Sequence, residues 1–293
     1  MVTGRCEADP LLIAKAVRLA RSLSMGLELF VCDAEQAYEL KHAYDSRGVE
    51  KVRQDCIQRV KADYLRHKDL LGLDEVPFSV DASFESPLYE SILRKVRRSR
   101  PALVIKAAGG GRPNHSAFDA NDWQLMRTCP SRLVLVRGRH WSKKMRIAAA
   151  IDVSEEEETK SLADTILNIA KDLARATDAD LDVAYAERAA PDESASRMRA
   201  QKLLALTREA GIAPDHVHIL AGHPERELSA FAAARNYDLM VLGALTHRPC
   251  PVSLVGTLTS VLVEGLECDF VLVKPGSYPY RVRSETALAA APA

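Results

Sequence analysis

SPLYESILRKVRRSRPALVIKA, residues 86–107, aligns without a gap with HPERELSAFAAARNYDLMVLGA, residues 223–244. Two further pairs of segments match in the same order, residues 27–33 with 181–187 and, after a one-residue adjustment, residues 129–136 with 268–273. Self-similarity of this length indicates an internal repeat. The chain therefore consists of two similar halves.

Strand and helix patterns alternate along each half. In the second half, apolar runs typical of strands occur at 146–152, 180–186, 216–220, 238–243 and 269–274, and helical spacing occurs at 162–178, 195–210, 226–235 and 257–266. A strand that is followed by a helix and then by another strand is typical of a parallel sheet with helices on both faces. We therefore predict an α/β fold with one parallel sheet in each half.

The first half departs from this pattern at its start, because the chain begins where the first helix is expected and the strand 146–152 has no counterpart. Either the first sheet lacks this strand or the true start lies upstream. If the strand is absent, the neighbouring strands must close up or a short N-terminal segment must fill the gap. We predict a first domain over 1–139 that lacks this first strand, a second domain over 140–280 and a disordered tail over 281–293.

Composition excludes several classes of protein. The 293 residues include 40 Lys and Arg and 40 Asp and Glu, so no net charge favours nucleic acid or an anionic membrane. No apolar run reaches the length of a transmembrane helix, and the first ten residues lack the apolar core of a signal peptide. The six cysteines form no CxxC pair. A cytoplasmic location is the expectation.

Two places in the second half are candidates for ligand binding. Gly243 ends a strand, and Gly256 with Thr257 begins a helix, where free N–H groups favour a phosphate. Asp152 ends another strand and could accept hydrogen bonds from a ribose hydroxyl or an adenine amine. The alternative is purely structural: a turn glycine, an N-cap threonine and a loop carboxylate before a capped helix.

These residues lie within segments that resemble a known family. The segments are IAAAIDVS (147–154), residues 222–243, residues 256–275 and DWQLMRTCPSRLVLV (122–136). Together they resemble the universal stress protein family, most closely its tandem, UspE type. The resemblance covers nearly the whole chain. It implies two tandem Rossmann-like domains of the adenine nucleotide alpha hydrolase-like kind, packed about a pseudo-twofold axis as an intramolecular pseudo-dimer.

The resemblance also implies a nucleotide site. ATP-binding members carry G-x2-G-x9-G-[ST], and Gly243, Thr246, Gly256 and Thr257 reproduce this spacing, with threonine in place of the middle glycine. The family's adenine- and ribose-contacting aspartate maps to Asp152. These five residues are therefore the expected nucleotide-binding set, with ATP as the ligand.

In the first half, Lys106 stands in place of Gly243, so nucleotide binding is expected in the second half only. No HExxH, GxSxG or similar catalytic motif occurs, and no metal site is expected. We therefore expect a stress protein with a regulatory or stress-resistance role and unknown protein partners, and not an enzyme, although slow ATP hydrolysis stays open. The alternative, which Thr246 and the acidic run 155–158 favour, is a scaffold or an apolar-ligand-binding stress protein.

Overall fold

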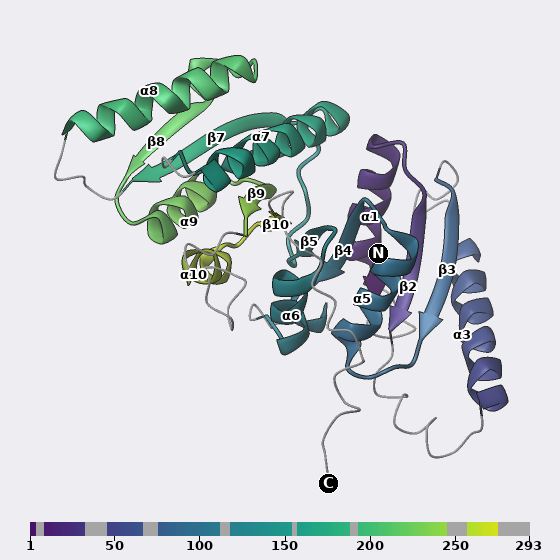
Figure 1. Ribbon diagram of the computed structural model, residues 1–293. Coiled ribbons are helices and arrows are strands. Elements are labelled where there is room, and N and C mark those ends of the chain that lie inside the picture. The colour runs from purple at the N-terminus through teal and green to yellow at the C-terminus, as the bar shows by residue number, and fades with distance from the viewer. Residues whose placement is uncertain are drawn as a thin grey trace, which may run out of the picture.

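The two halves of the chain repeat one strand order in the computed structural model (Figure 1). The structure describes residues 1–3, 9–32, 46–66, 76–111, 118–153, 157–187, 193–244 and 257–274. The strands of the first half are β1 (Val2–Thr3), β2 (Leu27–Cys32), β3 (Phe78–Ser83), β4 (Leu103–Ala107) and β5 (Arg132–Val136). Those of the second half are β6 (Arg146–Ala150), β7 (Asp180–Glu187), β8 (Val217–Ala221), β9 (Leu239–Gly243) and β10 (Asp269–Val273).

Within each half all neighbouring strands are parallel, in the orders β3-β2-β1-β4-β5 and β8-β7-β6-β9-β10. The helices are α1 (Pro10–Ser22), α3 (Ser46–Arg66), α5 (Leu88–Ser99), α6 (Ala120–Thr128), α7 (Glu157–Thr177), α8 (Glu193–Glu209), α9 (Pro224–Ala234) and α10 (Thr257–Gly265). Short 3-10 helices occur at Ala108–Gly111 and Pro214–His216. This alternation confirms the predicted α/β fold of two parallel-stranded halves.

The expectation of two separate sheets is wrong. Strands β5 and β10 pair in antiparallel fashion and join the halves into one ten-stranded sheet, as the centre of Figure 1 shows. Val134 lies opposite Val271, and the sequence repeat aligns these two residues with each other. The physical reason is that both strands would otherwise be sheet edges whose apolar residues and backbone groups lack a partner. Pairing buries Leu135 and Phe270 completely.

The place of the missing first strand is taken by a short N-terminal segment. Strand β1 has two residues, whereas its counterpart β6 has five. It lies between β2 and β4, with Val2 opposite Phe30 on one side and Lys106 on the other. The Met1 ammonium donates a hydrogen bond of 2.7 Å to Glu28 O. The first half therefore does not lack this strand entirely, as predicted, but has a two-residue strand that fills the gap from the N-terminal segment.

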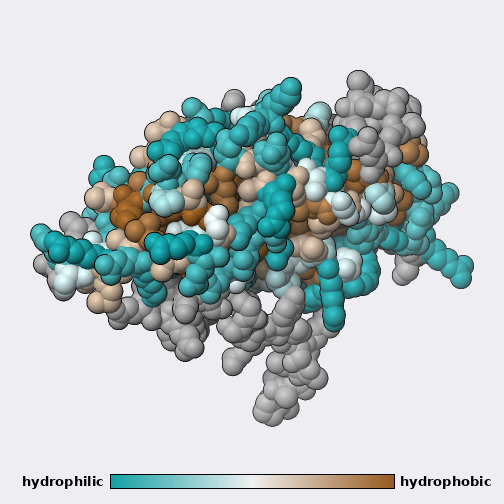
Figure 2. All heavy atoms as spheres, turned by 90° about the horizontal axis from the view of Figure 1, so that it is seen from above, coloured by the Kyte–Doolittle hydropathy of each residue, from teal (hydrophilic) through white to brown (hydrophobic). Residues whose placement is uncertain are grey.

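Two hydrophobic cores lie on opposite faces of the sheet. One lies under α1, α3, α7 and α8, and the other under α5, α6, α9 and α10. Cys32, Cys56, Cys129 and Cys268 are free thiols buried within these cores. On the face drawn in Figure 2, hydrophilic side chains cover most of the described surface, and hydrophobic ones show between them. No helix of the described part of the chain is long and apolar enough to cross a membrane.

Buried polar contacts hold residues 137–144, the linker between the halves, in place. Lys15 Nζ on α1 lies 2.6 Å from Asp269 Oδ2 on β10, and both side chains are almost fully buried. The same carboxylate accepts hydrogen bonds from Trp141 Nε1 at 2.7 Å and Arg137 N at 2.6 Å. Asp238, just before β9, accepts from Ser142 N at 2.8 Å. These hydrogen bonds attach the linker to the second half, and the ion pair of Lys15 with Asp269 attaches α1 to it.

Candidate functional site

The candidate site lies where the strand order of the second half reverses. From β6 the chain goes to β7 on one side, whereas β9 pairs with β6 on the other side. Ligands of open parallel sheets bind outside the carboxyl ends of the strands at such a switch point. Ala149 lies opposite Val241. Asp152 comes shortly after β6 and Gly243 ends β9, so these two predicted residues lie at the carboxyl ends of neighbouring strands.

Asp152 follows the carboxyl end of β6 and is half-buried. The preceding Ile151 N–H donates a hydrogen bond of 3.1 Å to Ala184 O, which fixes the backbone beside β7. Burial of the Tyr185 phenol, together with the charges of Glu187 and Asp152, raises the pKa of Tyr185 to about 12. The site thus combines a carboxylate with a neutral phenol on the neighbouring strand.

Glu187 ends β7 at the same edge of the sheet. Its carboxylate pairs with Arg199 and accepts a hydrogen bond of 3.0 Å from Ser196 Oγ, both on α8. These contacts hold the negative charge of Glu187 against α8.

Gly243 has a packing role that the sequence did not reveal. A Cβ atom added to it would lie 2.5 Å from Leu162 Cδ2 and 3.1 Å from Ile166 Cδ1, both on α7. The end of β9 therefore packs closely against α7, and a side chain at this position would require Leu162 to shift. Its backbone continues into a hydrogen bond of 2.8 Å from Ala244 N to Val273 O.

The remaining predicted residues are only partly described. Thr257 begins α10, which leads from the carboxyl end of β9 back to β10, so its first turn lies at the same edge as Asp152. The Thr257 side chain, Thr246 and Gly256 lie outside the described residues.

The corresponding edge of the first half is filled by the protein's own side chains. Lys106, at the position aligned with Gly243, lies with its Nζ 2.6 Å from Asp122 Oδ1 in the first turn of α6. Asp122 Oδ2 accepts hydrogen bonds from Gly109 N at 2.7 Å and Asp119 N at 3.1 Å. Both charged side chains are buried. The N–H groups that a phosphate would require are thus used by a carboxylate.

Sequence reasoning missed Asp122 as the partner of Lys106. The signal was available, because Asp119 and Asp122 have the spacing of a capping box, and Asp122 N donates to Asp119 Oδ1 at 2.7 Å. The pairing was not predicted because the sequence does not show how the chain runs between Lys106 and the start of α6.

Two histidines around β8 approach the buried Asp182 Oδ1, His216 Nδ1 at 2.8 Å and His218 Nε2 at 3.3 Å. Tyr237 donates to the other carboxylate oxygen at 2.5 Å. Within the described residues, no three His, Cys, Asp or Glu side chains are arranged to hold a metal ion. The cluster therefore links β7 and β8 to Tyr237, which lies between α9 and β9.

Comparisons with known proteins agree with this architecture. Residues 144–274 match the model of the universal stress protein family. The chain is 25% identical to a universal stress protein E homolog of Haemophilus influenzae, over 90% of this chain and 92% of that protein. Universal stress protein E of Escherichia coli K12 is 24% identical over 93% of this chain and 92% of its own length.

Two solved structures share the fold over nearly the whole chain. A functionally unknown protein from Pseudomonas aeruginosa PAO1 has a TM-score of 0.74 at 21% identity and covers 94% of this chain and 91% of its own. A universal stress protein from Archaeoglobus fulgidus has a TM-score of 0.64 at 12% identity, with 94% and 96% covered. At these identities the likeness concerns the fold alone.

Proposed function

We propose that this protein is a cytoplasmic stress protein that binds ATP, since residues 144–274 match the model of the universal stress protein family and nearly the whole chain is similar to universal stress protein E. Binding takes place in the second half and serves a regulatory or stress-resistance role. The proposed domains are residues 1–139 and 140–280, arranged as an intramolecular pseudo-dimer about the pairing of Val134 with Val271.

The contrast between the two switch points carries this proposal. In the first half, the buried pair of Lys106 and Asp122 uses the space and the N–H groups at the strand end. In the second half, Gly243 has no side chain at the end of β9, and Asp152 follows the neighbouring strand β6. The second half thus keeps the features that favour a ligand, whereas the first half has replaced them by an internal ion pair.

Each residue of the proposed site has a distinct task. Asp152 accepts hydrogen bonds from the ribose hydroxyls or the adenine amine. Thr257, with Gly256, supplies the first N–H groups of α10 to the phosphates, which the helix dipole favours. Gly243 ends β9, and Thr246 stands at the position of the middle glycine of the expected pattern. The protein acts as a nucleotide-dependent binder rather than as an enzyme, with at most slow hydrolysis.

A second candidate function is a scaffold that binds no nucleotide. The observation in its favour is the contact of Gly243 with Leu162, since close packing against α7 by itself favours glycine at this position. On this alternative, Asp152 is a loop carboxylate, and calorimetric titration of the wild type detects no binding of ATP.

Calorimetric titration of the full chain with ATP separates the two candidates. Asp152→Ala should weaken binding about tenfold or more, because a hydrogen bond to a charged group contributes roughly 1.5–3 kcal/mol. Asp172→Ala, which removes an exposed carboxylate from α7, is the matched control and should bind as the wild type does. Equal affinity of wild type and Asp152→Ala would remove Asp152 from the site.

A further inference from the structure

The antiparallel pairing of β5 with β10 brings a cation of each half to a helix of the other half. The repeat that aligns Val134 with Val271 also aligns Arg137 with Lys274, each three residues further along the chain. Helices α6 and α10 cover the same face of the sheet, one on each side of this pairing (Figure 1). Arg137 bonds to α10, and Lys274 bonds to the end of α6.

Both cations donate to backbone carbonyls at the C-terminal end of the helix. Arg137 Nη2 lies 3.2 Å from Val263 O in the last turn of α10, and Lys274 Nζ lies 2.8 Å from Cys129 O at the C-cap of α6. The last four carbonyls of a helix have no partner within it, and the helix dipole favours a cation there. Since Val263 is buried and Arg137 half-buried, water competes poorly for this carbonyl.

The Arg137 guanidinium is held in place by the first half. Its Cζ lies over the Phe118 ring, 4.9 Å from the ring centroid, and the Phe118 ring packs edge-on against Phe270 at 5.7 Å between centroids. The backbone N–H of Arg137 donates to Asp269 Oδ1 at 2.6 Å. Phe118 directly precedes Asp119, the N-cap of α6. The helix start that closes the edge of the first half therefore also fixes this ring.

The two helices differ in what lies at their N-terminal ends. Helix α10 begins at Thr257, where the proposed site binds the phosphates, whereas the first turn of α6 is closed by the Asp122 carboxylate. With nine residues, α10 is roughly 14 Å long, so a displacement of its last turn is transmitted to its first. Arg137 therefore contacts the helix whose other end is the proposed phosphate site.

We propose that Arg137, which follows the last strand of the first half, is a positioning residue for the ATP site of the second half. It holds α10 at its C-terminal end, so that the N–H groups of the first turn meet the phosphates without being ordered at the moment of binding. This role rests on the proposed function. It gives the first half, whose own strand-end site is closed, the task of supporting the nucleotide-binding helix.

Calorimetric titration of the full chain with ATP tests this role. Arg137→Met removes the donor to Val263 O and should weaken ATP binding about fivefold or more. Arg137→Lys keeps a cationic donor without the planar group and should recover part of the loss. Arg18→Met is the matched control, because Arg18 donates to the linker carbonyls of Ser142 and Lys143 and makes no contact with α10. It should bind ATP as the wild type does.

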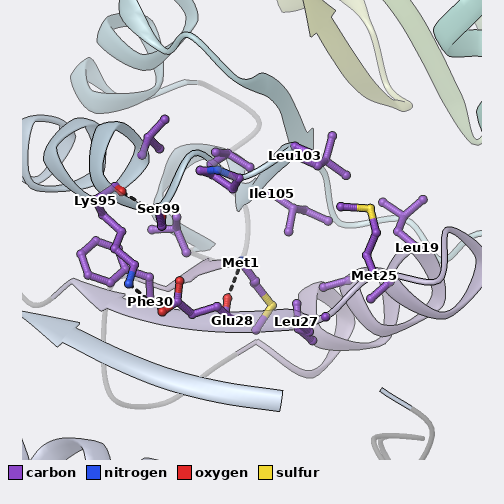
Figure 3. A pocket seen from close by; sticks show the side chains of 18 of the residues that line it. Met1, Leu19, Met25, Leu27, Glu28, Phe30, Lys95, Ser99, Leu103 and Ile105 are labelled. Atoms are coloured by element: carbon purple, nitrogen blue, oxygen red, sulfur yellow. Dashed lines mark hydrogen bonds and ion pairs between the residues drawn. The ribbon is translucent and has the colours of Figure 1, made fainter. Parts of the chain in front are cut away.

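A second control separates positioning from a general loss of stability. Leu27→Ala truncates a buried side chain on β2 beside the cavity of about 170 Å³ in the first half, where Figure 3 labels Leu27. Strands β1, β4 and β5 lie between β2 and β10. This variant should lower the melting temperature at least as far as Arg137→Met does and still bind ATP as the wild type does.

Backbone hydrogen exchange without ATP locates the effect. Exchange over α10 should be faster in Arg137→Met and in Phe118→Leu, which removes the ring under the guanidinium, than in Arg18→Met. Equal ATP affinity of Arg137→Met and a wild type that binds, or equal exchange over α10, would overturn the positioning role and leave the proposed function intact. A loss of affinity as large in Leu27→Ala would also overturn it. A wild type that binds no ATP would refute the proposed function and this role with it.

Discussion

Lys106 and Asp122 form a buried ion pair of 2.6 Å at the position where the repeat places Gly243 in the other half. A pair of this kind is retained only when each charge has its partner, because the protein interior solvates an isolated charge poorly. The two halves therefore use equivalent sheet edges differently. One edge is closed by its own side chains, and the other is the proposed nucleotide site.

Removing one member of this pair should strongly destabilise the protein. Asp122→Asn leaves the Lys106 ammonium buried beside a neutral amide, and the expected loss is roughly 3–5 kcal/mol in the free energy of unfolding. Urea denaturation measures it. The double variant Lys106→Met with Asp122→Asn should recover much of the loss, because no charge then stays unpaired. A double variant no more stable than Asp122→Asn would contradict this explanation.

The pair of Lys15 and Asp269 should matter more than an exposed pair of the same length. Lys15→Met leaves Asp269 buried without its counter-charge and should cost roughly 3–5 kcal/mol in unfolding free energy. Lys144 and Asp180 are also 2.6 Å apart, but both are well exposed, so Lys144→Met should change stability by at most about 1 kcal/mol. Similar losses in both variants would show that burial does not decide the effect.

The packing role of Gly243 can be separated from any ligand role. Gly243→Ala places a Cβ atom 2.5 Å from Leu162 Cδ2, and overpacking of this kind costs roughly 1–3 kcal/mol. Adding Leu162→Ala makes room, so the introduced alanine should then cost little relative to Leu162→Ala alone. Gly138→Ala, which meets nothing within 4 Å, is the control for the glycine change itself. Melting curves decide the stability effect, and ATP titration of the double variant tests the ligand effect.

Stability below neutral pH should depend on Asp182. Burial alone would raise the pKa of this carboxyl, but hydrogen bonds from Tyr237, His216 and His218 hold it below the ordinary 3.8. A depressed native pKa gives stability that is present above the unfolded value and is lost as the pH falls through the native one. Asp182→Asn should therefore flatten the decline in unfolding free energy below about pH 5. An unchanged decline in urea titrations from pH 7 to pH 3 would contradict this role.

Periodicity and the repeat predicted the fold class because they record which residues are buried. They did not predict the single sheet. Arg132–Val136 has the pattern of a buried strand, and this pattern is the same whether the strand paired on its far side comes from its own half or from the other half. The gap at the first strand was foreseen from the alignment. That Val2 and Thr3 fill it follows from contacts with Phe30 and Val31 that no local pattern encodes.

The candidate site was predictable in part. Asp152 and Gly243 stand at strand ends in the sequence, and the strand order of the sheet brings them together. The contact between Gly243 and Leu162 was not predictable, because it depends on how closely α7 approaches the sheet. The pairing of Lys106 with Asp122 likewise needs the path of the chain between β4 and α6.

The stoichiometry of ATP binding to the full chain tests the central claim most directly. Calorimetric titration should give one ATP per chain, at a site that Asp152→Ala weakens about tenfold or more and Asp172→Ala leaves unchanged. Two equivalents per chain would mean that the pair of Lys106 and Asp122 does not close the first half. No binding at millimolar ATP would contradict the nucleotide site itself.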